Sequence, residues 1–281
     1  MPSSGSFPRV DAGAARRRFD RAAKTYAGGA RLEQEVADRM LERLDYMRLA
    51  PRRILDAASG PGREAAKLHA RYRAAELIRA DFSLAMLRQG HAWLFDRKKR
   101  VCADLARLPF AAGAFDFVWC NMALHWAADP LSWLGELSRM LAPEGLLMFS
   151  TLGPDTLRAL GAAAGTARVH EFVDMHDLGD MLVEVGLAAP VMDMEMLTIA
   201  YGSGDALVAD LRATGQTNAR ADRPRGLAGK SFLRKLRTLK ADATYEVVYG
   251  HAWKGAPRKL ADGRDIVKFA PPKLRGRGSS P

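Results

Sequence analysis

Short apolar runs alternate with helical patterns between residues 52 and 151, and this alternation constrains the fold more than any other feature of the sequence. The runs that we interpret as strands lie at 52–57, 76–80, 100–104, 115–121 and 145–151. The helical patterns between them run from a glycine-rich turn through Leu68, from the capping residue Ser83 to near Phe95, and over 130–141. Strands that alternate with helices are typical of βαβ units, which build a parallel sheet. We therefore predict an α/β fold with a Rossmann-like, mostly parallel sheet.

The spacing of strands and helices becomes less regular after residue 152. A helix at about 176–185 precedes strands at about 190–200 and 243–253, which brings the predicted sheet to seven strands. Residues 203–242 hold two helical patterns, and a structureless insertion of this length is uncommon inside a domain. We interpret 203–242 as a helical lid segment over the carboxyl edge of the sheet. One or two amphipathic helices are predicted over 19–49 and would cover the same edge.

The chain thus divides into five predicted segments. They are an N-terminal tail with covering helices (1–49), the core (50–202), the lid segment (203–242), the last core strand (243–253) and a basic tail (254–281). The basic tail carries eight Lys and Arg residues against two Asp residues, together with Pro, Gly and Ser. Such a composition indicates a disordered extension.

Charge and composition bound the possible partners and compartment. The formal net charge of +11 admits nucleic acid, an anionic membrane surface or an acidic protein. No apolar stretch approaches the roughly 18 residues of a membrane span, so we expect a soluble, cytoplasmic protein without membrane contact. A mitochondrial transit peptide is the alternative for the N-terminus, and Asp11 and Asp20 count against it. Cys102 and Cys120 belong to no metal-ligand cluster, so we expect no metal and a reducing compartment.

A glycine-rich turn, Gly60-Pro61-Gly62, follows the first predicted strand and opens a helix. Such a turn lets the backbone approach a ligand and directs helix N–H groups at it. Asp81 ends the second strand, where a carboxylate suits the hydroxyls of a ribose, and Asp104 follows the third, where it suits the amine of adenine. These positions predict an adenosine site at the point where the strand order reverses. The turn also fits the dinucleotide fingerprint GxGxxA, so an NAD dehydrogenase is the alternative.

The same part of the chain resembles the class I S-adenosylmethionine-dependent methyltransferases. The resemblance covers residues 50–152 and rests on Asp56, Gly60, Gly62, Asp81, Asp104, Leu108-Pro109-Phe110, Phe115-Asp116 and Leu141-Ala142-Pro143-Glu144-Gly145. An NAD dehydrogenase explains neither Asp56 nor the segments 108–110 and 142–145. The chain departs from the family at Ala58, where the first glycine of the turn is usual. The resemblance implies S-adenosylmethionine as cofactor, bound by Asp56, Ala58, Gly60, Gly62, Asp81, Phe82, Asp104, Leu105 and Asn121.

Outside the core, the chain is similar to the malonyl-[acyl-carrier protein] O-methyltransferases of biotin synthesis. The matching pieces are residues 19–26 with Leu32, Leu124-His125-Trp126 and Leu211-Arg212-Ala213-Thr214-Gly215, although the family often has Gln at the positions of Glu33 and His125. Nucleic-acid methylation would require a segment such as (D/N/S)PP(Y/F), or Pro-Cys, after the fourth strand. The chain has Asn121-Met122-Ala123 there, so we expect no nucleic-acid partner.

A second family shares some of these residues. The S-adenosylmethionine-binding assembly factors of respiratory complex I, which are reported as arginine hydroxylases, share Leu124-His125-Trp126, a near match to 153–157, Asp177-Leu178-Gly179 and the last strand with Trp253-Lys254. A third possibility is a non-catalytic binding module that kept the fold. Ala58 leaves some room for such a module, whereas Asp56, Asp81 and Asp104 argue against it.

The malonyl resemblance implies carboxyl methylation. The substrate carboxylate is ionised at neutral pH and acts as the nucleophile itself, so no general base is required. Such a site needs a cation and hydrogen-bond donors for the carboxylate, and we assign these roles to Arg212, Tyr26 and His125. The implied partner is an acidic acyl-carrier protein, steered by basic residues of the lid segment. These are Arg220, Arg223, Arg225, Lys230, Arg234, Lys235 and Arg237.

Overall fold

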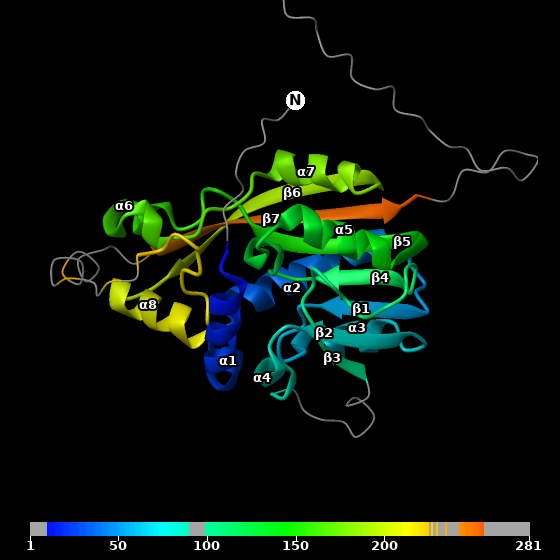
Figure 1. Cartoon of the computed structure of the whole chain (residues 1–281), viewed down its shortest axis with the longest axis horizontal. Helices are drawn as coiled ribbons and strands as arrows, with labels where there is room; N and C mark the ends of the chain where they lie inside the picture. Colours follow the sequence, from blue (N-terminus) through cyan, green and yellow to red (C-terminus); the bar gives the residue numbers. More distant parts are fainter. Residues whose placement is uncertain are drawn as a thin grey trace, which may run out of the picture.

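A seven-stranded sheet runs through the centre of the molecule (Figure 1). The computed structural model describes residues 10–89, 99–224, 226, 229, 234 and 242–255. Its strands are β1 (Arg53–Ala57), β2 (Glu76–Asp81), β3 (Arg100–Cys102), β4 (Phe115–Cys120), β5 (Leu141–Leu152), β6 (Leu187–Ala200) and β7 (Asp242–Lys254). Their order is β3-β2-β1-β4-β5-β7-β6, and β7 runs antiparallel to both of its neighbours. The predicted seven-stranded, mostly parallel sheet is confirmed.

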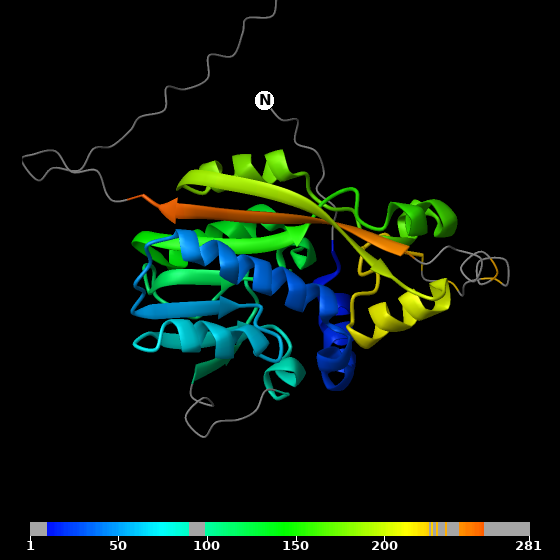
Figure 2. The same ribbon diagram turned by 180° about the vertical axis from the view of Figure 1, so that it is seen from behind.

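Helices cover both faces of the sheet. They are α1 (Ala12–Gly29), α2 (Arg31–Arg43), α3 (Arg63–Arg71), α4 (Leu84–Leu87), α5 (Pro130–Met140), α6 (Arg158–Ala164), α7 (Met175–Glu184) and α8 (Gly204–Ala213), with 3-10 turns η1 (Leu44–Tyr46), η3 (Leu124–Trp126) and η4 (Thr166–Arg168). On one face α2 and α3 pack Val36 and Leu68 against Phe117 (Figure 2). On the other face α5 and α7 pack Leu134 and Leu182 (Figure 1). Because helices cover both faces of the sheet, β1 and β4 are almost continuously buried.

The strand order places a crevice at the carboxyl ends of β1 and β4. Because β1 pairs with β2 on one side and with β4 on the other, the connections after these strands leave in opposite directions. The glycine-rich turn follows β1 at this edge, and η3 follows β4. Ligand-binding side chains are therefore expected here.

The N-terminal helix and the lid segment lie side by side at this edge of the sheet (Figure 1). The Thr25 hydroxyl donates a hydrogen bond of 2.7 Å to the carbonyl of Ala213, at the end of α8. The amide of Asp11, which caps α1, donates a hydrogen bond of 2.8 Å to the carbonyl of Ala219. These contacts join the two segments, and the expected role of residues 203–242 as a lid over the carboxyl edge stays a prediction.

Three local expectations differ from the structure or lie outside the part it describes. The helix predicted from Ser83 to near Phe95 is described only as α4, which ends at Leu87, and 90–98 lie outside the described residues. The turn predicted at 143–145 is a strand irregularity within β5, where Glu144 has φ 62°. Most of the second half of the lid segment and nearly all of the basic tail also lie outside the described residues. The division of the chain into five segments stays a prediction.

None of the helices in the described part of the chain is long and apolar enough to cross a membrane.

Candidate active site

The glycine-rich turn between β1 and α3 is built around the Arg79 side chain. Arg79 donates a hydrogen bond of 3.0 Å to the carbonyl of Gly60. Gly62 has φ 82°, and a Cβ atom there would lie 2.0 Å from the Arg79 guanidinium carbon. Gly60 has φ 50°, and a Cβ atom there would meet nothing within 4 Å. Gly62 is therefore required by packing, whereas Gly60 leaves open space beside the turn.

Asp81 fixes the end of β2 against this turn. One carboxylate oxygen accepts the amide of Gly60 at 2.8 Å, and the other accepts the amide of Ser83 at 2.7 Å. Burial raises the pKa of Asp81 to about 6, against the lowering effect of these two hydrogen bonds. A carboxylate has about four lone-pair positions, so Asp81 retains acceptor capacity for two ribose hydroxyls.

A small cavity of about 50 Å³, the cofactor cavity, lies beside Asp81. It brings together six of the nine predicted cofactor-binding residues, which are Ala58, Gly60, Asp81, Phe82, Leu105 and Asn121. Tyr26, predicted as a catalytic residue, also lines it. Residues 19–26 and η3 complete the wall with Phe19 and Trp126, which we had not assigned to the site.

Three predicted cofactor-binding residues do not line this cavity. Gly62 packs against the Arg79 side chain, and Asp56 borders a second space of about 20 Å³ that shares Tyr26, Ala58, Gly60 and Asn121 with the cofactor cavity. Asp104 is exposed and accepts the amide of Ala106 at 2.9 Å, while its neighbour Leu105 lines the cofactor cavity. The assignment of Asp104 to adenine stays a prediction.

Two buried carboxyl groups face this second space. Asp56 Oδ2 and Glu33 Oε1 are buried and have no hydrogen-bond partner among the described residues. Burial raises the pKa of Glu33 to about 7 and that of Asp56 well above its usual range. Unpaired buried acceptors beside a glycine turn suit the cationic amino acid end of S-adenosylmethionine. The residues present therefore fit this cofactor.

Asn121 connects the second space to the core. Its amide nitrogen donates a hydrogen bond of 3.0 Å to the carbonyl of Glu33, and its carbonyl oxygen accepts the Ser150 hydroxyl at 2.8 Å. Asn121 thus ties α2 to the ends of β4 and β5.

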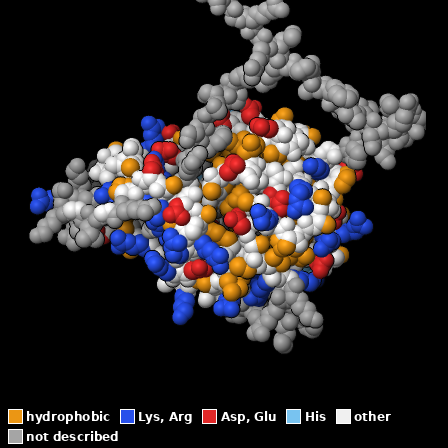
Figure 3. Space-filling model, in the orientation of Figure 1, with side chains coloured by type: hydrophobic (Ala, Val, Ile, Leu, Met, Phe, Trp, Pro, Cys, Tyr) orange, Lys and Arg blue, Asp and Glu red, His pale blue; other side chains and the backbone are white. Residues whose placement is uncertain are grey.

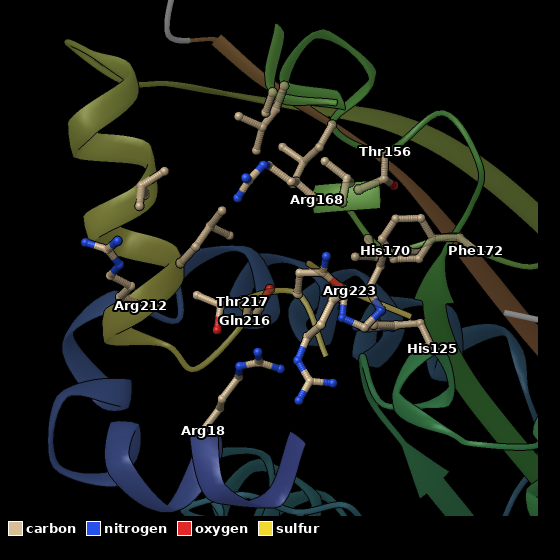
Figure 4. Close-up of a pocket in the computed structure, with 18 of the residues that line it drawn as sticks. Arg18, His125, Thr156, Arg168, His170, Phe172, Arg212, Gln216, Thr217 and Arg223 are labelled. Atoms are coloured by element: carbon tan, nitrogen blue, oxygen red, sulfur yellow. The ribbon is translucent and has the colours of Figure 1, made fainter. Parts of the chain in front are cut away.

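A larger cavity of about 710 Å³, the outer cavity, lies between α1, α6, α8 and the segment 216–224 (Figure 4). His125 and Arg212 line it, but Tyr26 does not. The structure therefore divides the three predicted catalytic residues between two cavities. Trp126 lines both, so the cavities adjoin at this side chain.

Aromatic rings pack around the junction of the two cavities. The ring centroids lie 5.0 Å apart for Phe19 and Trp126, and 4.8 Å apart for Trp126 and His170. His125 Nδ1 lies 3.3 Å from the Thr151 hydroxyl, and burial lowers the pKa of His125 to about 3. His125 is consequently uncharged at neutral pH and can act as a hydrogen-bond donor but not as a cation.

Four arginines and no acidic residue stand among the described residues that line the outer cavity. Arg18, Arg168 and Arg223 reach into it, whereas the guanidinium of Arg212 points away from its centre (Figure 4). Arg212 is exposed on α8. Its predicted role as the carboxylate-binding cation stays a prediction, and its orientation does not favour it.

Some of these residues carried a signal in the sequence and others did not. Phe19 and Tyr26 are seven positions apart, which places them on one face of a helix, and Trp126 belongs to a motif already noted. Arg18 was overlooked because the covering helix was expected to begin at Phe19, whereas α1 begins at Ala12. His170 follows η4 in a stretch without periodicity.

The fold, with a glycine turn and an acidic strand end at the carboxyl edge, defines a class I S-adenosylmethionine-dependent methyltransferase. A family model described as "Methyltransferase domain" matches residues 55–149. The fold is similar to that of the YcgJ protein of Bacillus subtilis, with a TM-score of 0.56 and 18% identity over 79% of this chain and 99% of that chain.

Two curated relatives define the family more narrowly. The malonyl-[acyl-carrier protein] O-methyltransferase of Methylovorus sp. (strain MP688) is 47% identical, over 93% of this chain and 96% of the relative. The protein of the same name from Laribacter hongkongensis (strain HLHK9) is also 47% identical, over 93% and 97%. The chain belongs to the malonyl-[acyl-carrier protein] O-methyltransferase family, and S-adenosylmethionine is its cofactor.

Proposed function

We propose that the protein methylates the free carboxylate of malonyl-[acyl-carrier protein], in the cytoplasm, as a step of biotin synthesis. The observation that carries this proposal is the junction at Trp126, where the cofactor cavity meets an outer cavity that is large enough for an acyl thioester. The walls of the outer cavity are apolar at Leu157, Leu160 and Val208 and cationic at its arginines. An acyl chain that ends in a carboxylate matches both kinds of wall.

The reaction needs little acid–base chemistry. S-adenosylmethionine supplies an electrophilic methyl group when bound. The substrate carboxylate would accept that methyl group as the nucleophile, with the electron pair of the S–C bond passing to sulfur, so the residues of this chain would have no proton to move. Catalysis then consists of aligning the carboxylate and excluding water, which contributes several kcal/mol.

Tyr26 and His125 are suited to hydrogen-bond donation at this junction. Burial raises the pKa of Tyr26 well above its usual range, so its hydroxyl keeps its proton. His125 is uncharged and carries one N–H. We assign Tyr26 to the cofactor side of the junction and His125 to the acyl side.

We assign the docking of the acidic carrier protein to the outer surfaces of α1 and α8. Lys and Arg side chains gather over these helices in Figure 3. The exposed cations there are Arg16, Arg17, Arg21, Lys24 and Arg212. This surface adjoins the outer cavity, and complementary charge speeds encounter.

The lid segment contributes less to this surface than we expected. Arg220 pairs with Glu171 and Asp222, and Arg223 pairs with Asp11. Both guanidinium groups are therefore engaged within the molecule. Arg225, Lys230, Lys235 and Arg237 lie outside the described residues.

The alternative of an arginine hydroxylase-like assembly factor is not favoured. Curated relatives with 42–47% identity over most of the chain carry the methyltransferase name. A cavity lined by four arginines would also repel a cationic arginine side chain.

The test is incubation of the purified protein with methyl-labelled S-adenosylmethionine and malonyl-[acyl-carrier protein]. We expect label in a base-labile methyl ester on the acyl group. Acetyl-[acyl-carrier protein], which lacks the carboxylate, is the matched control and should take up no label. Absence of a labelled ester with the malonyl substrate would reject the proposed function.

A further inference from the structure

Arg18 is an arginine of the outer cavity whose guanidinium lacks hydrogen-bond partners within the described part of the protein. It is half-buried on α1, and its Nη1 atom is buried without a hydrogen-bond partner among the described residues. Figure 4 shows its guanidinium pointing from α1 into the cavity, beside that of Arg223. Leaving a buried charged donor unpaired is costly, so such a group indicates a ligand that completes it.

Arg223 is held rigidly next to Arg18. Its Nη1 donates a hydrogen bond of 2.6 Å to the carbonyl of Arg220, and its Nη2 lies 3.1 Å from Asp11 Oδ2. Asp11 therefore compensates Arg223 but leaves Arg18 without an ion pair among the described residues. Burial and the charge of Arg223 lower the pKa of Arg18 from its usual value. The two adjacent guanidinium groups carry two positive charges, and Asp11 balances only that of Arg223. An anion between the two groups is therefore favoured.

The other titratable groups that face Arg18 do not supply this anion. His170 accepts the Ala219 amide at 2.8 Å through Nε2, and its pKa is lowered to about 4 by burial and then by the charge of Arg18. His125, Arg168 and Tyr245 also line the cavity, and none of them is anionic at neutral pH. Asp11 is the remaining anionic neighbour of Arg18, and its carboxylate is already paired with Arg223, so a second negative charge would come from a ligand.

The position of Arg18 relative to the cofactor cavity specifies that ligand. His170 faces Arg18 and packs on Trp126 with ring centroids 4.8 Å apart, and Trp126 lines both cavities. An anion bound by Arg18 therefore lies close to the junction, where the methyl group is transferred. The phosphate of a pantetheine arm lies at the opposite end of the arm from the acyl carboxylate, and so belongs further out.

We propose that Arg18, with Arg223 beside it, binds the acyl carboxylate that accepts the methyl group, and thereby selects acyl chains that end in a carboxylate. This inference rests on the proposed function, since it assigns the substrate contact of the same site. One carboxylate oxygen faces the guanidinium groups while the other faces the cofactor cavity. Methylation removes the negative charge, so the ester product loses its attraction to Arg18 and is released in favour of new substrate.

The test compares wild-type protein with Arg18→Ala and Arg18→Lys, using two small substrates that need no carrier protein. Malonyl-pantetheine has the carboxylate and no phosphate, and acetyl-pantetheine lacks both. We expect wild type to bind malonyl-pantetheine about tenfold more tightly than acetyl-pantetheine. In Arg18→Ala this preference should fall to about twofold, with S-adenosylmethionine affinity unchanged by calorimetry. Arg18→Lys should lie between them, because it keeps the charge but loses the planar fork.

Arg52→Ala is the matched control, because Arg52 is exposed before β1, at the opposite edge of the sheet. It should retain the wild-type preference. Retained cofactor affinity shows that each variant is folded. A wild-type preference retained in Arg18→Ala would overturn the inference while leaving the proposed function intact. The inference would also be overturned if Arg18→Ala weakened the binding of malonyl-phosphopantetheine but not that of malonyl-pantetheine, since Arg18 would then bind the phosphate. A wild-type protein that methylates no malonyl thioester would instead reject the proposed function itself.

Discussion

Three residues at the two cavities adopt backbone angles that their side chains disfavour. Ala58 has φ 57° and Met122 has φ 50°, and both line the cofactor cavity. Leu157 has φ 55° and lines the outer cavity. A side chain in this left-handed region costs roughly 1–2 kcal/mol. Strain of this kind gathers at binding sites, where the surrounding structure holds the backbone in place.

Ala58→Gly should therefore raise the free energy of unfolding by about 1 kcal/mol, because glycine adopts φ 57° without strain. Its S-adenosylmethionine affinity should be similar or slightly higher, since the usual residue of the family is restored. Denaturant unfolding and calorimetry measure the two quantities. Ala57→Gly, in the buried strand β1, is the control and should lower stability instead. A large loss of cofactor affinity in Ala58→Gly would show that the turn is wrongly assigned.

Glu33 makes the stability of the ligand-free protein depend on pH. Its pKa is about 7 in the folded protein and 4.5 ordinarily, so folding favours its protonated form. Its stabilising contribution is fully present below pH 4.5 and is lost as the pH rises through 7. Glu33→Gln removes this loss and should raise the free energy of unfolding at pH 8 by about 1–3 kcal/mol. Unfolding curves at pH 5 and pH 8 test this, and an equal difference between variant and wild type at both pH values would contradict it.

At the scale of elements, Asp11 joins the N-terminal helix to the lid segment. One oxygen accepts the Ala14 amide at 2.8 Å as the cap of α1, and the other pairs with Arg223 at 3.1 Å. Asp11→Ala should lower the free energy of unfolding by about 1–2 kcal/mol, because it removes both contacts. Asp11→Asn keeps a good helix cap but loses the charge, so its free energy of unfolding should fall by less than that of Asp11→Ala. Thermal unfolding compares them, and an alanine variant as stable as wild type would refute this function of Asp11.

The elements that the sequence predicted well are those with a strong periodic signal. The predicted bounds of β4 and α5 differ from the structure by one residue at most, since Phe115 begins an apolar run and Asp129 with Pro130 marks a helix start. The helix after Ser83 is described only to Leu87, and most of its predicted extension to Phe95 lies outside the described residues. Helix α6 was missed, since its Gly- and Ala-rich sequence has a single buried leucine, Leu160, and no apolar stripe.

At the scale of the whole molecule, the two halves of the site differed in how well they could be predicted. Asp81 and the glycine turn lie at strand ends that parallel topology brings to one edge, so spacing alone placed them together. Arg18, His170 and Arg223 come from three distant segments, and no spacing rule relates them. Their meeting depends on how α1 and the lid segment pack, which only the tertiary structure shows.

The carrier-docking surface is also a property of the whole molecule. Arg17→Glu should raise KM for malonyl-[acyl-carrier protein] about tenfold at low salt, because it places a negative charge opposite an acidic partner. The KM for malonyl-pantetheine should not change. Arg52→Glu, at the opposite edge of the sheet, is the control and should behave as wild type with both substrates. If Arg17→Glu and Arg52→Glu changed the KM for malonyl-[acyl-carrier protein] equally, the outer surface of α1 would have no docking role.

Trp126 offers a route for coupling between the two ligands, because one indole ring forms part of both cavities. A shift of this ring when the cofactor binds changes the wall that the acyl group then meets, and the reverse holds when the acyl group binds first. Linkage between two sites is reciprocal, so each ligand changes the affinity for the other by the same factor. Any movement of the Trp126 ring that one ligand induces would therefore appear as an equal change in the affinity for the other ligand.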